Sequence, residues 1–245
     1  MFMETYVSGT ISVKAVLEER KREITELWVN PKKRSRDIAY LIAIAKQNRI
    51  PVMFKDGKEM NETAPSNGGV ILLCQSREMP VLAVNDGLKG LCVYISGVED
   101  PYNLGSIART LYAAGASKMI IQKRDWSFAL PTLMRSSAGA WERLEICTIE
   151  NDEALIQTAK NANREIVCAA RDDNARPLFQ EILEEDSLIA IGGAMRGLSS
   201  AVLEAGKTHL YIPYGREFRN ALDSVSAASV FAFAWTKDHE NRLHS

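Results

Sequence analysis

The sequence has no long apolar run and few cysteines. No stretch offers about 18 uninterrupted apolar residues, and its first residues lack a basic region followed by an apolar core, so neither membrane insertion nor secretion is expected. The 4 cysteines are far apart and three lie inside apolar runs, which favours buried free thiols over a disulfide framework or a zinc site. A reducing, cytoplasmic location is therefore expected.

Common signatures of small-molecule chemistry are also missing. Neither a Walker A sequence nor the dinucleotide motif G-x-G-x-x-G occurs, which counts against the familiar nucleotide-phosphate folds. Of the 3 histidines, two lie close to the C-terminal end and one precedes an expected strand, so none is an obvious general base. No group of ligand residues indicates a metal site.

The net charge of −1 does not by itself suggest a nucleic-acid partner, but the charges are unevenly distributed. Residues 1–90 carry 14 Lys and Arg against 11 Asp and Glu, whereas the rest of the chain carries 16 against 20. The first part contains two compact basic clusters, 20–22 and 32–36. Such runs are usually solvated faces, although both could contact phosphates.

The order of apolar segments predicts an α/β protein with two domains. Residues 7–76 read as a small α/β unit, with helices at 13–21 and 35–48 and strands at 24–29, near 52–53 and at 70–74. From Leu91 onward, apolar strands alternate with helical patterns, which predicts a largely parallel sheet covered on both faces. Its expected strands are 92–96, 119–122, 145–148, 165–169, 188–191 and 209–212. We place the domains at 1–76 and 91–245, with a linker at 77–90.

Three segments that follow expected strands could carry chemistry. In 97–109, Asn103 is expected near the N-cap of a helix over 104–114 that ends at Gly115, and Gly105 leaves room for a ligand beside Arg109. In 189–199, closely spaced glycines expose backbone groups. In 211–229, a strand ends at a proline, and small residues later open a helix that runs to about Thr236. Taken singly, each segment also has an ordinary structural explanation.

Together and in this order, the three segments resemble the SpoU/TrmH family of RNA ribose methyltransferases. The resemblance spans residues 91–236, and the first 76 residues are similar to the RNA-binding domain, itself like ribosomal protein L30e, that precedes many family members. It implies a SPOUT catalytic domain with a C-terminal trefoil knot, bound S-adenosylmethionine and a homodimer. It also implies methylation of a ribose 2′-hydroxyl in ribosomal or transfer RNA, with RNA as the partner rather than DNA or a membrane.

The resemblance also assigns roles to residues. Asn103 and Arg109 match the catalytic motif, and Gly192, Ile212 and Leu222 match positions that hold the cofactor through backbone groups and apolar contact with the adenine. The remaining expected site residues are Asp223 for catalysis, Gly197 for the cofactor, and Lys32, Lys33, Arg34 and Arg36 for RNA.

Two departures from the family pattern leave alternatives open. Ala194 stands where the family usually has a glutamate, and Asp223 stands where it has an asparagine, whose amide an acceptor-only carboxylate cannot fully replace. Neighbouring polar residues could compensate or form an ordinary surface ion cluster: Arg216, Glu217, Arg219 and Asn220. One alternative is a non-catalytic RNA-binding protein of the same fold that acts in ribosome assembly. A weaker one is a doubly wound small-molecule enzyme.

Methyl transfer to a ribose hydroxyl depends strongly on positioning, because the oxygen must attack in line and lose its proton. Arg109 is the family's catalytic candidate. Since a guanidinium with a pKa above about 12 is a poor base, we expect Arg109 to anchor phosphate and stabilise the developing oxyanion.

Overall fold

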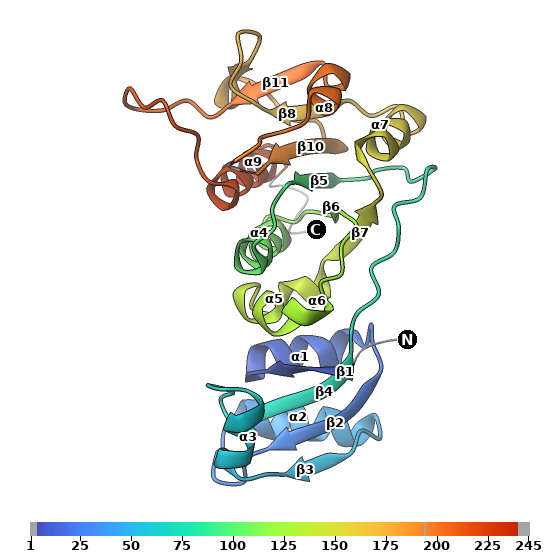
Figure 1. The fold of residues 1–245 in the computed structure, drawn as a ribbon, viewed down its shortest axis with the longest axis vertical. Coiled ribbons are helices and arrows are strands. Elements are labelled where there is room, and N and C mark those ends of the chain that lie inside the picture. The colour runs from blue at the N-terminus through green and yellow to red at the C-terminus, as the bar shows by residue number, and fades with distance from the viewer. Residues whose placement is uncertain (1–3, 194, 240–245) are drawn as a thin grey trace. The chain divides into compact units, whose positions relative to one another are not determined.

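The computed structural model describes residues 4–193 and 195–239, and its backbone falls into two compact units (Figure 1). The amino-terminal unit comprises the described residues up to Glu78 together with Asp125–Arg143. The carboxyl-terminal unit comprises Met79–Arg124 and the described residues from Leu144 onward. The segment Asp125–Arg143, which the predicted division places in the second domain, thus packs with the first unit.

The amino-terminal unit is built on a four-stranded sheet in the order β1-β4-β2-β3, in which only the β2–β3 pair is parallel. Ser35 accepts a hydrogen bond from the Ile38 N–H and so fixes the start of the second helix. The elements are β1 (Glu4–Ser8), α1 (Thr10–Glu19), β2 (Ile24–Val29), α2 (Arg36–Gln47), β3 (Val52–Phe54), α3 (Gly57–Thr63), β4 (Val70–Gln75), η1 (Ser127–Ala129), α5 (Leu130–Ser136) and α6 (Ala140–Arg143).

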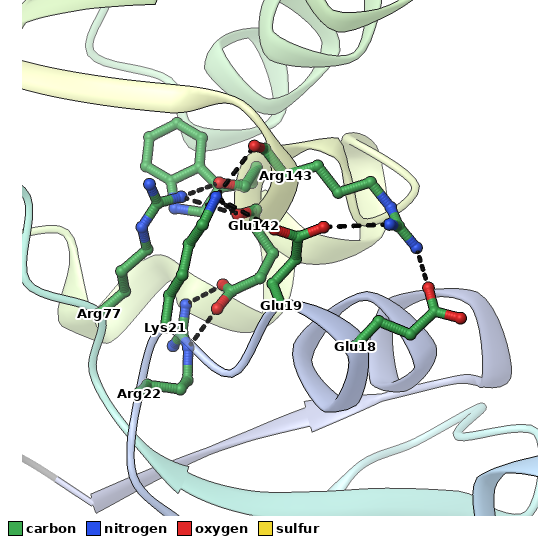
Figure 2. Close-up of polar contacts among 8 residues, drawn as sticks. Glu18, Glu19, Lys21, Arg22, Arg77, Glu142 and Arg143 are labelled. Carbon is green, nitrogen blue, oxygen red and sulfur yellow. Dashed lines mark hydrogen bonds and ion pairs between the residues drawn. The ribbon is translucent and has the colours of Figure 1, made fainter. Parts of the chain in front are cut away.

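A buried ion pair joins α6 to the rest of this unit. The side chains of Arg22 and Glu142 are both 0% exposed, and their paired contacts are 3.2 Å for Nε to Oε1 and 2.5 Å for Nη2 to Oε2 (Figure 2). Lys21 donates to the carbonyls of Glu142 and Arg143 at 2.9 and 3.0 Å, where α6 ends. Close packing accompanies the pair, since a Cβ on Gly139 would lie 2.8 Å from the Ala15 Cβ.

The carboxyl-terminal unit contains a seven-stranded sheet in the order β7-β6-β5-β10-β8-β11-β9, in which every pairing is parallel. Helix α4 packs against α9, and α7 packs against α8. The elements are β5 (Leu91–Ser96), α4 (Pro101–Ala113), β6 (Lys118–Gln122), β7 (Glu145–Ile149), α7 (Asp152–Asn161), β8 (Ile166–Ala169), β9 (Arg176–Pro177), η2 (Leu178–Gln180), β10 (Ser187–Gly192), α8 (Ser200–Ala205), β11 (Thr208–Tyr211) and α9 (Ser224–Asp238).

The predicted α/β class with a parallel sheet is confirmed, as is the expectation that all four cysteines are buried and free. Burial raises the pKa of the Cys168 thiol to about 12, so this sulfur stays protonated. The predictions omitted β1, α3 and β9 and gave no bounds for α5, α6, α7 and α8. The helix expected at 13–21 is α1, which begins three residues earlier and ends two residues earlier. Among the described residues, no helix has the length and apolar character needed to cross a membrane.

Candidate active site

A cavity of about 370 Å³ opens at the carboxyl end of the parallel sheet, where ligands of such sheets bind. Its size suits a small organic ligand. Leucine, isoleucine and phenylalanine side chains provide most of the apolar wall, and three charged side chains stand beside them. The lining is Ala169, Ala170, Arg171, Asp172, Ile191, Gly192, Gly193, Arg196, Gly197, Leu198, Leu203, Leu210, Tyr211, Ile212, Tyr214, Ala221, Leu222, Ala227 and Phe231.

A glycine turn forms one wall of this cavity. Gly193 and Gly197 pair as an antiparallel bridge, and Gly197 has a φ of +65°, which glycine adopts without strain. A Cβ on Gly192 would lie 2.2 Å from the Gly197 carbonyl carbon. Only glycine therefore fits at position 192, and the wall is made of backbone there.

All four residues predicted to hold the cofactor lie in the wall of this one cavity, although they come from two separate segments, 189–199 and 211–229: Gly192, Gly197, Ile212 and Leu222. Arg171, Asp172 and Tyr214 also line it and were not predicted. The first two follow β8, which lies between β10 and β11 in the sheet. Their place in the cavity thus depends on strand order, for which the sequence carries no local signal.

The loop between β11 and α9 is held by Arg171 and Tyr214. The Arg171 guanidinium carbon lies 4.6 Å from the centroid of the Tyr214 ring, and its Nη1 donates to the carbonyls of Phe218 and Asn220, each at 3.4 Å. The Tyr214 hydroxyl donates to the Asn220 carbonyl at 3.3 Å and accepts from the Leu222 N–H at 3.1 Å. These contacts fix the backbone that presents Leu222 to the cavity.

A histidine–aspartate pair also lies at the cavity, where Asp172 and Leu203 are lining residues. The Nδ1 of His209 lies 2.5 Å from the Asp172 Oδ2, and Nε2 lies 3.0 Å from the Leu203 carbonyl oxygen. Both neighbours are acceptors, so both ring nitrogens donate only when the imidazole is protonated. Burial lowers the pKa of His209, but hydrogen bonds to Asp172 and to the Leu203 carbonyl outweigh it, and the net pKa is raised.

The prediction that Asn103 caps α4 is wrong. Asp100 is the N-cap, and its carboxylate accepts from the Asn103 N–H at 2.7 Å. Pro101, whose fixed φ suits the first helical position, starts the helix two residues earlier than Asn103. Gly115 does adopt a left-handed φ of +81° after the helix, as predicted.

The catalytic candidates on α4 are exposed. Asn103 and Arg109 both face solvent, and neither lines the 370 Å³ cavity. The Arg109 guanidinium makes no ion pair or hydrogen bond within the described residues. Gly105, which was expected to leave room beside Arg109, is buried. Arg109 is thus available to an external anion.

Hydrogen bonds from helix α9 link α4, which carries Asn103 and Arg109, to the wall of the cavity. Ser229 on α9 donates through Oγ to the Thr110 Oγ1 on α4 at 3.4 Å, and Ser224 donates to the Gly192 carbonyl at 3.1 Å. Asp223 is the N-cap of α9, where its carboxylate accepts from the Ser226 N–H at 2.9 Å and the Ser226 hydroxyl at 2.7 Å. These hydrogen bonds lower the pKa of Asp223, which stays ionised.

The neighbours considered as compensating residues are also exposed. Within the described part of the chain, no ion pair involves Arg216, Glu217 or Arg219, so the expected surface ion cluster is absent there. Ala194 lies outside the described residues. The part of the chain that is described holds no group of three or more His, Cys, Asp or Glu side chains arranged to bind a metal.

The two basic clusters of the amino-terminal unit differ in their surroundings. In the first cluster Arg22 is buried against Glu142, and Arg20 donates to the Asn48 side chain at 2.6 Å, so the idea that the cluster contacts phosphates is wrong for Arg22. The second cluster is exposed, and none of its basic side chains forms an ion pair with another described residue: Lys32, Lys33, Arg34 and Arg36.

Comparison with known families gives two matches that together cover most of the chain. Residues 90–233 match the SpoU rRNA Methylase family, and residues 6–80 match the RNA 2′-O ribose methyltransferase substrate binding family. The first match alone spans more than half of the chain.

Several curated proteins are similar over most of their length. The mitochondrial rRNA methyltransferase 1 of Schizosaccharomyces pombe is 24% identical over 270 residues, which cover 94% of this chain and 88% of that protein. The 23S rRNA (guanosine-2′-O-)-methyltransferase RlmB of Pseudomonas putida is 25% identical over 199 residues, which cover 78% of this chain and 80% of that protein.

Solved structures share the fold. An RNA 2′-O ribose methyltransferase superimposes with a TM-score of 0.81 at 20% identity, covering 97% of this chain and 89% of the other. The SpoU methyltransferase AviRb from Streptomyces viridochromogenes, solved in complex with the cofactor AdoMet, superimposes with a TM-score of 0.77 at 18% identity, covering 97% of this chain and 91% of the other.

Proposed function

The chain belongs to the SpoU rRNA methylase family, and from this membership we propose that the cavity at the end of its sheet is the active-site pocket of an RNA methyltransferase. The enzyme transfers a methyl group from S-adenosylmethionine to a ribose 2′-hydroxyl of ribosomal or transfer RNA. The observation that carries the site assignment is that Gly192, Gly197, Ile212 and Leu222 line one cavity.

The lining of the cavity fits the chemistry of S-adenosylmethionine. The backbone of Gly192 and Gly197 offers hydrogen-bonding groups with no Cβ in the way, and Ile212 and Leu222 supply apolar contact for the adenine. Arg171 and other charged lining residues suit the zwitterionic methionyl end. When bound, S-adenosylmethionine supplies an electrophilic methyl group on a sulfonium.

On the protein side, catalysis depends on positioning and on charge. Arg109 is exposed and without an ion pair among the described residues, so its guanidinium is free to hold an RNA phosphate and to stabilise the oxyanion that develops on the ribose. Asn103, six residues earlier on α4, is also exposed and offers an amide to the ribose. Asp223 orders the start of α9, the helix that packs against α4.

We further propose that the protein binds RNA through its amino-terminal unit, forms a homodimer and acts in the cytoplasm. The exposed cluster of Lys32, Lys33, Arg34 and Arg36 binds the RNA backbone. Exposed Tyr112 and Phe233, on the packed helices α4 and α9, favour a homodimer that covers these helices. The four buried free thiols favour a reducing cytoplasm. The trefoil knot remains an implication of the family resemblance.

Calorimetric titration with S-adenosylmethionine tests the pocket. Binding at about micromolar Kd corresponds to about −8 kcal/mol. Incubation with labelled cofactor and unmodified ribosomal or transfer RNA, followed by nuclease digestion and mass spectrometry, then identifies the 2′-O-methylated nucleoside. No binding heat at several temperatures, and no methylated nucleoside, would instead indicate a cofactor-free RNA-binding relative.

Two variants divide the roles. Arg109→Ala should abolish transfer and leave cofactor affinity nearly unchanged. Reversal of Lys32, Lys33, Arg34 and Arg36 to glutamate should weaken RNA binding and flatten its salt dependence, whereas reversal of the exposed Lys160 and Lys207 in the other unit should not. Equal salt dependence in both charge-reversed proteins would rule out the cluster as an RNA contact.

A further inference from the structure

A second cavity, of about 440 Å³, adjoins the proposed cofactor pocket. Its lining is Pro213, Tyr214, Gly215, Arg216, Phe218 and Leu222, all from the segment between β11 and α9 (Figure 1). Tyr214 and Leu222 line both cavities and so form a shared wall. A ligand in the second cavity would therefore lie next to the proposed methyl donor site.

Of the two aromatic rings in this cavity, only Phe218 is suited to contact a ligand. One face of Tyr214 is covered by the Arg171 guanidinium, whose central carbon is 4.6 Å from the ring centroid. The Tyr214 and Phe218 centroids are 6.0 Å apart and the rings are tilted by 46°, so they contact each other and leave no slot between them. Phe218 is 51% exposed.

The exposed ring stands on an anchored backbone. The Phe218 carbonyl accepts from Arg171 Nη1 at 3.4 Å and from Nη2 at 3.5 Å, and the neighbouring Asn220 carbonyl accepts from the Tyr214 hydroxyl. The exposed half of this apolar side chain gains nothing from burial in the folded chain. A flat external partner that stacks on the ring would recover that free energy.

The charge around the ring favours stacking over phosphate binding. Arg216 and Arg219 are exposed and form no ion pair within the described residues, but Glu217 lies between them in sequence and Asp223 follows. The opposed charges leave little net positive potential for a phosphate. An aromatic ring beside arginines is the arrangement that holds unpaired RNA bases.

We propose that Phe218, in the cavity that shares Tyr214 and Leu222 with the cofactor pocket, stacks on the base of the unpaired nucleotide whose ribose is methylated. This inference rests on the proposed function, because the shared wall matters only if the first cavity holds the methyl donor. It implies that the target nucleotide is single-stranded or extruded from a helix, and that stacking tolerates more than one base.

The test compares Phe218→Leu, which keeps an apolar side chain but removes the aromatic face, with Phe218→Trp, which keeps the face. The full chain is assayed for methyl transfer to in vitro transcribed ribosomal and transfer RNA. We expect Phe218→Leu to lower kcat/KM for RNA by about 5- to 150-fold, the range that matches base-stacking energies. Phe218→Trp should retain activity, and S-adenosylmethionine Kd should stay within about twofold in both variants.

Phe179→Leu is the matched control, since Phe179 is 57% exposed, belongs to the same unit and lines neither cavity. A single-stranded RNA oligonucleotide that contains 2-aminopurine reports stacking without turnover, because stacking on Phe218 quenches its fluorescence. Inactive wild-type protein would contradict the proposed function, whereas active wild type with an equally active Phe218→Leu variant would overturn this inference. Equal quenching by wild type and Phe218→Leu would overturn it in the absence of turnover.

Discussion

Removal of either partner of the Arg22–Glu142 ion pair should lower the free energy of unfolding of the amino-terminal unit and leave that of the other unit unchanged. Both side chains are 0% exposed, and Glu142 receives two of the three hydrogen bonds that Arg22 donates to described residues (Figure 2). The third goes to the Gln75 carbonyl at 3.2 Å. Glu142→Leu therefore leaves a buried guanidinium with one remaining acceptor. Breaking such a pair costs about 3–5 kcal/mol.

The double variant separates the pairing from the packing. Arg22→Met together with Glu142→Leu removes both charges while it keeps apolar volume at both positions. Since replacement of a buried ion pair by apolar residues is often neutral or stabilising, most of the loss seen in either single variant should be recovered. Only the hydrogen bond from Arg22 to the Gln75 carbonyl stays lost.

Hydrogen exchange with mass spectrometry is the suitable assay, because it reports each unit separately. Peptides from β2 and β4 in Glu142→Leu should lose roughly two to four orders of magnitude of protection. Peptides from β5 and β10 in the other unit serve as the internal reference. Lys14→Met is the control variant in the same unit, since it breaks the Lys14–Glu18 pair, whose side chains are 49% and 25% exposed, and should change stability by about 0–1 kcal/mol.

The reasoning would be refuted if Glu142→Leu and Lys14→Met lost similar, small amounts of protection in β2 and β4. That result would mean that water reaches the pair in solution and screens it as it screens a surface pair. A double variant as unstable as the single variants would indicate that packing around α6, rather than charge pairing, holds the segment.

Other predictions concern the carboxyl-terminal unit. Gly192→Ala should abolish S-adenosylmethionine binding in calorimetry, because its Cβ would meet the turn backbone at 2.2 Å, whereas Gly87→Ala, whose Cβ has its closest neighbour at 3.8 Å, should bind normally. Asp223→Ala should lower the free energy of unfolding by about 0.5–2 kcal/mol through loss of the α9 N-cap, and Asp223→Asn should keep that stability in urea titrations. Because the pKa of His209 is raised by folding, its stabilisation is complete below the unfolded value of about 6.5 and is lost as pH rises through the folded pKa. His209→Gln should flatten the fall in the urea midpoint above that pH.

Strands with continuous apolar sequence could be predicted closely. The strand expected at 70–74 is β4 without its last residue, and the one expected at 188–191 is the centre of β10, because buried strands of a sheet need apolar side chains on both faces. The omitted elements carry no such pattern. Strand β9 is only two residues long, and α3 buries a single side chain, Met60, so neither produces a period that could be recognised.

Part of the candidate site could be predicted because its residues lie in compact motifs. Gly192 and Ile212 each stand at the end of an apolar strand, where parallel sheets place their ligands. Arg171 and Tyr214 are 43 positions apart in the sequence. They meet because β8 and β11 are neighbours in the sheet. Strand order of this kind is a property of the folded chain, so the contact by which Arg171 and Tyr214 hold the loop between β11 and α9 could not be predicted from the sequence.

The two basic clusters show why charge patterns alone misled. Both are short runs rich in Lys and Arg, yet Arg22 is enclosed by a carboxylate 120 positions away, whereas Lys32 to Arg36 stay exposed. Burial of a guanidinium requires a partner with matching geometry, and a partner so distant in sequence leaves no trace beside the cluster. Arg22 ties Asp125–Arg143, a segment inside the methylase family match, to the part of the chain that matches the substrate-binding family. Its charge therefore serves the fold, and of the two clusters it is the second that we propose as the RNA contact.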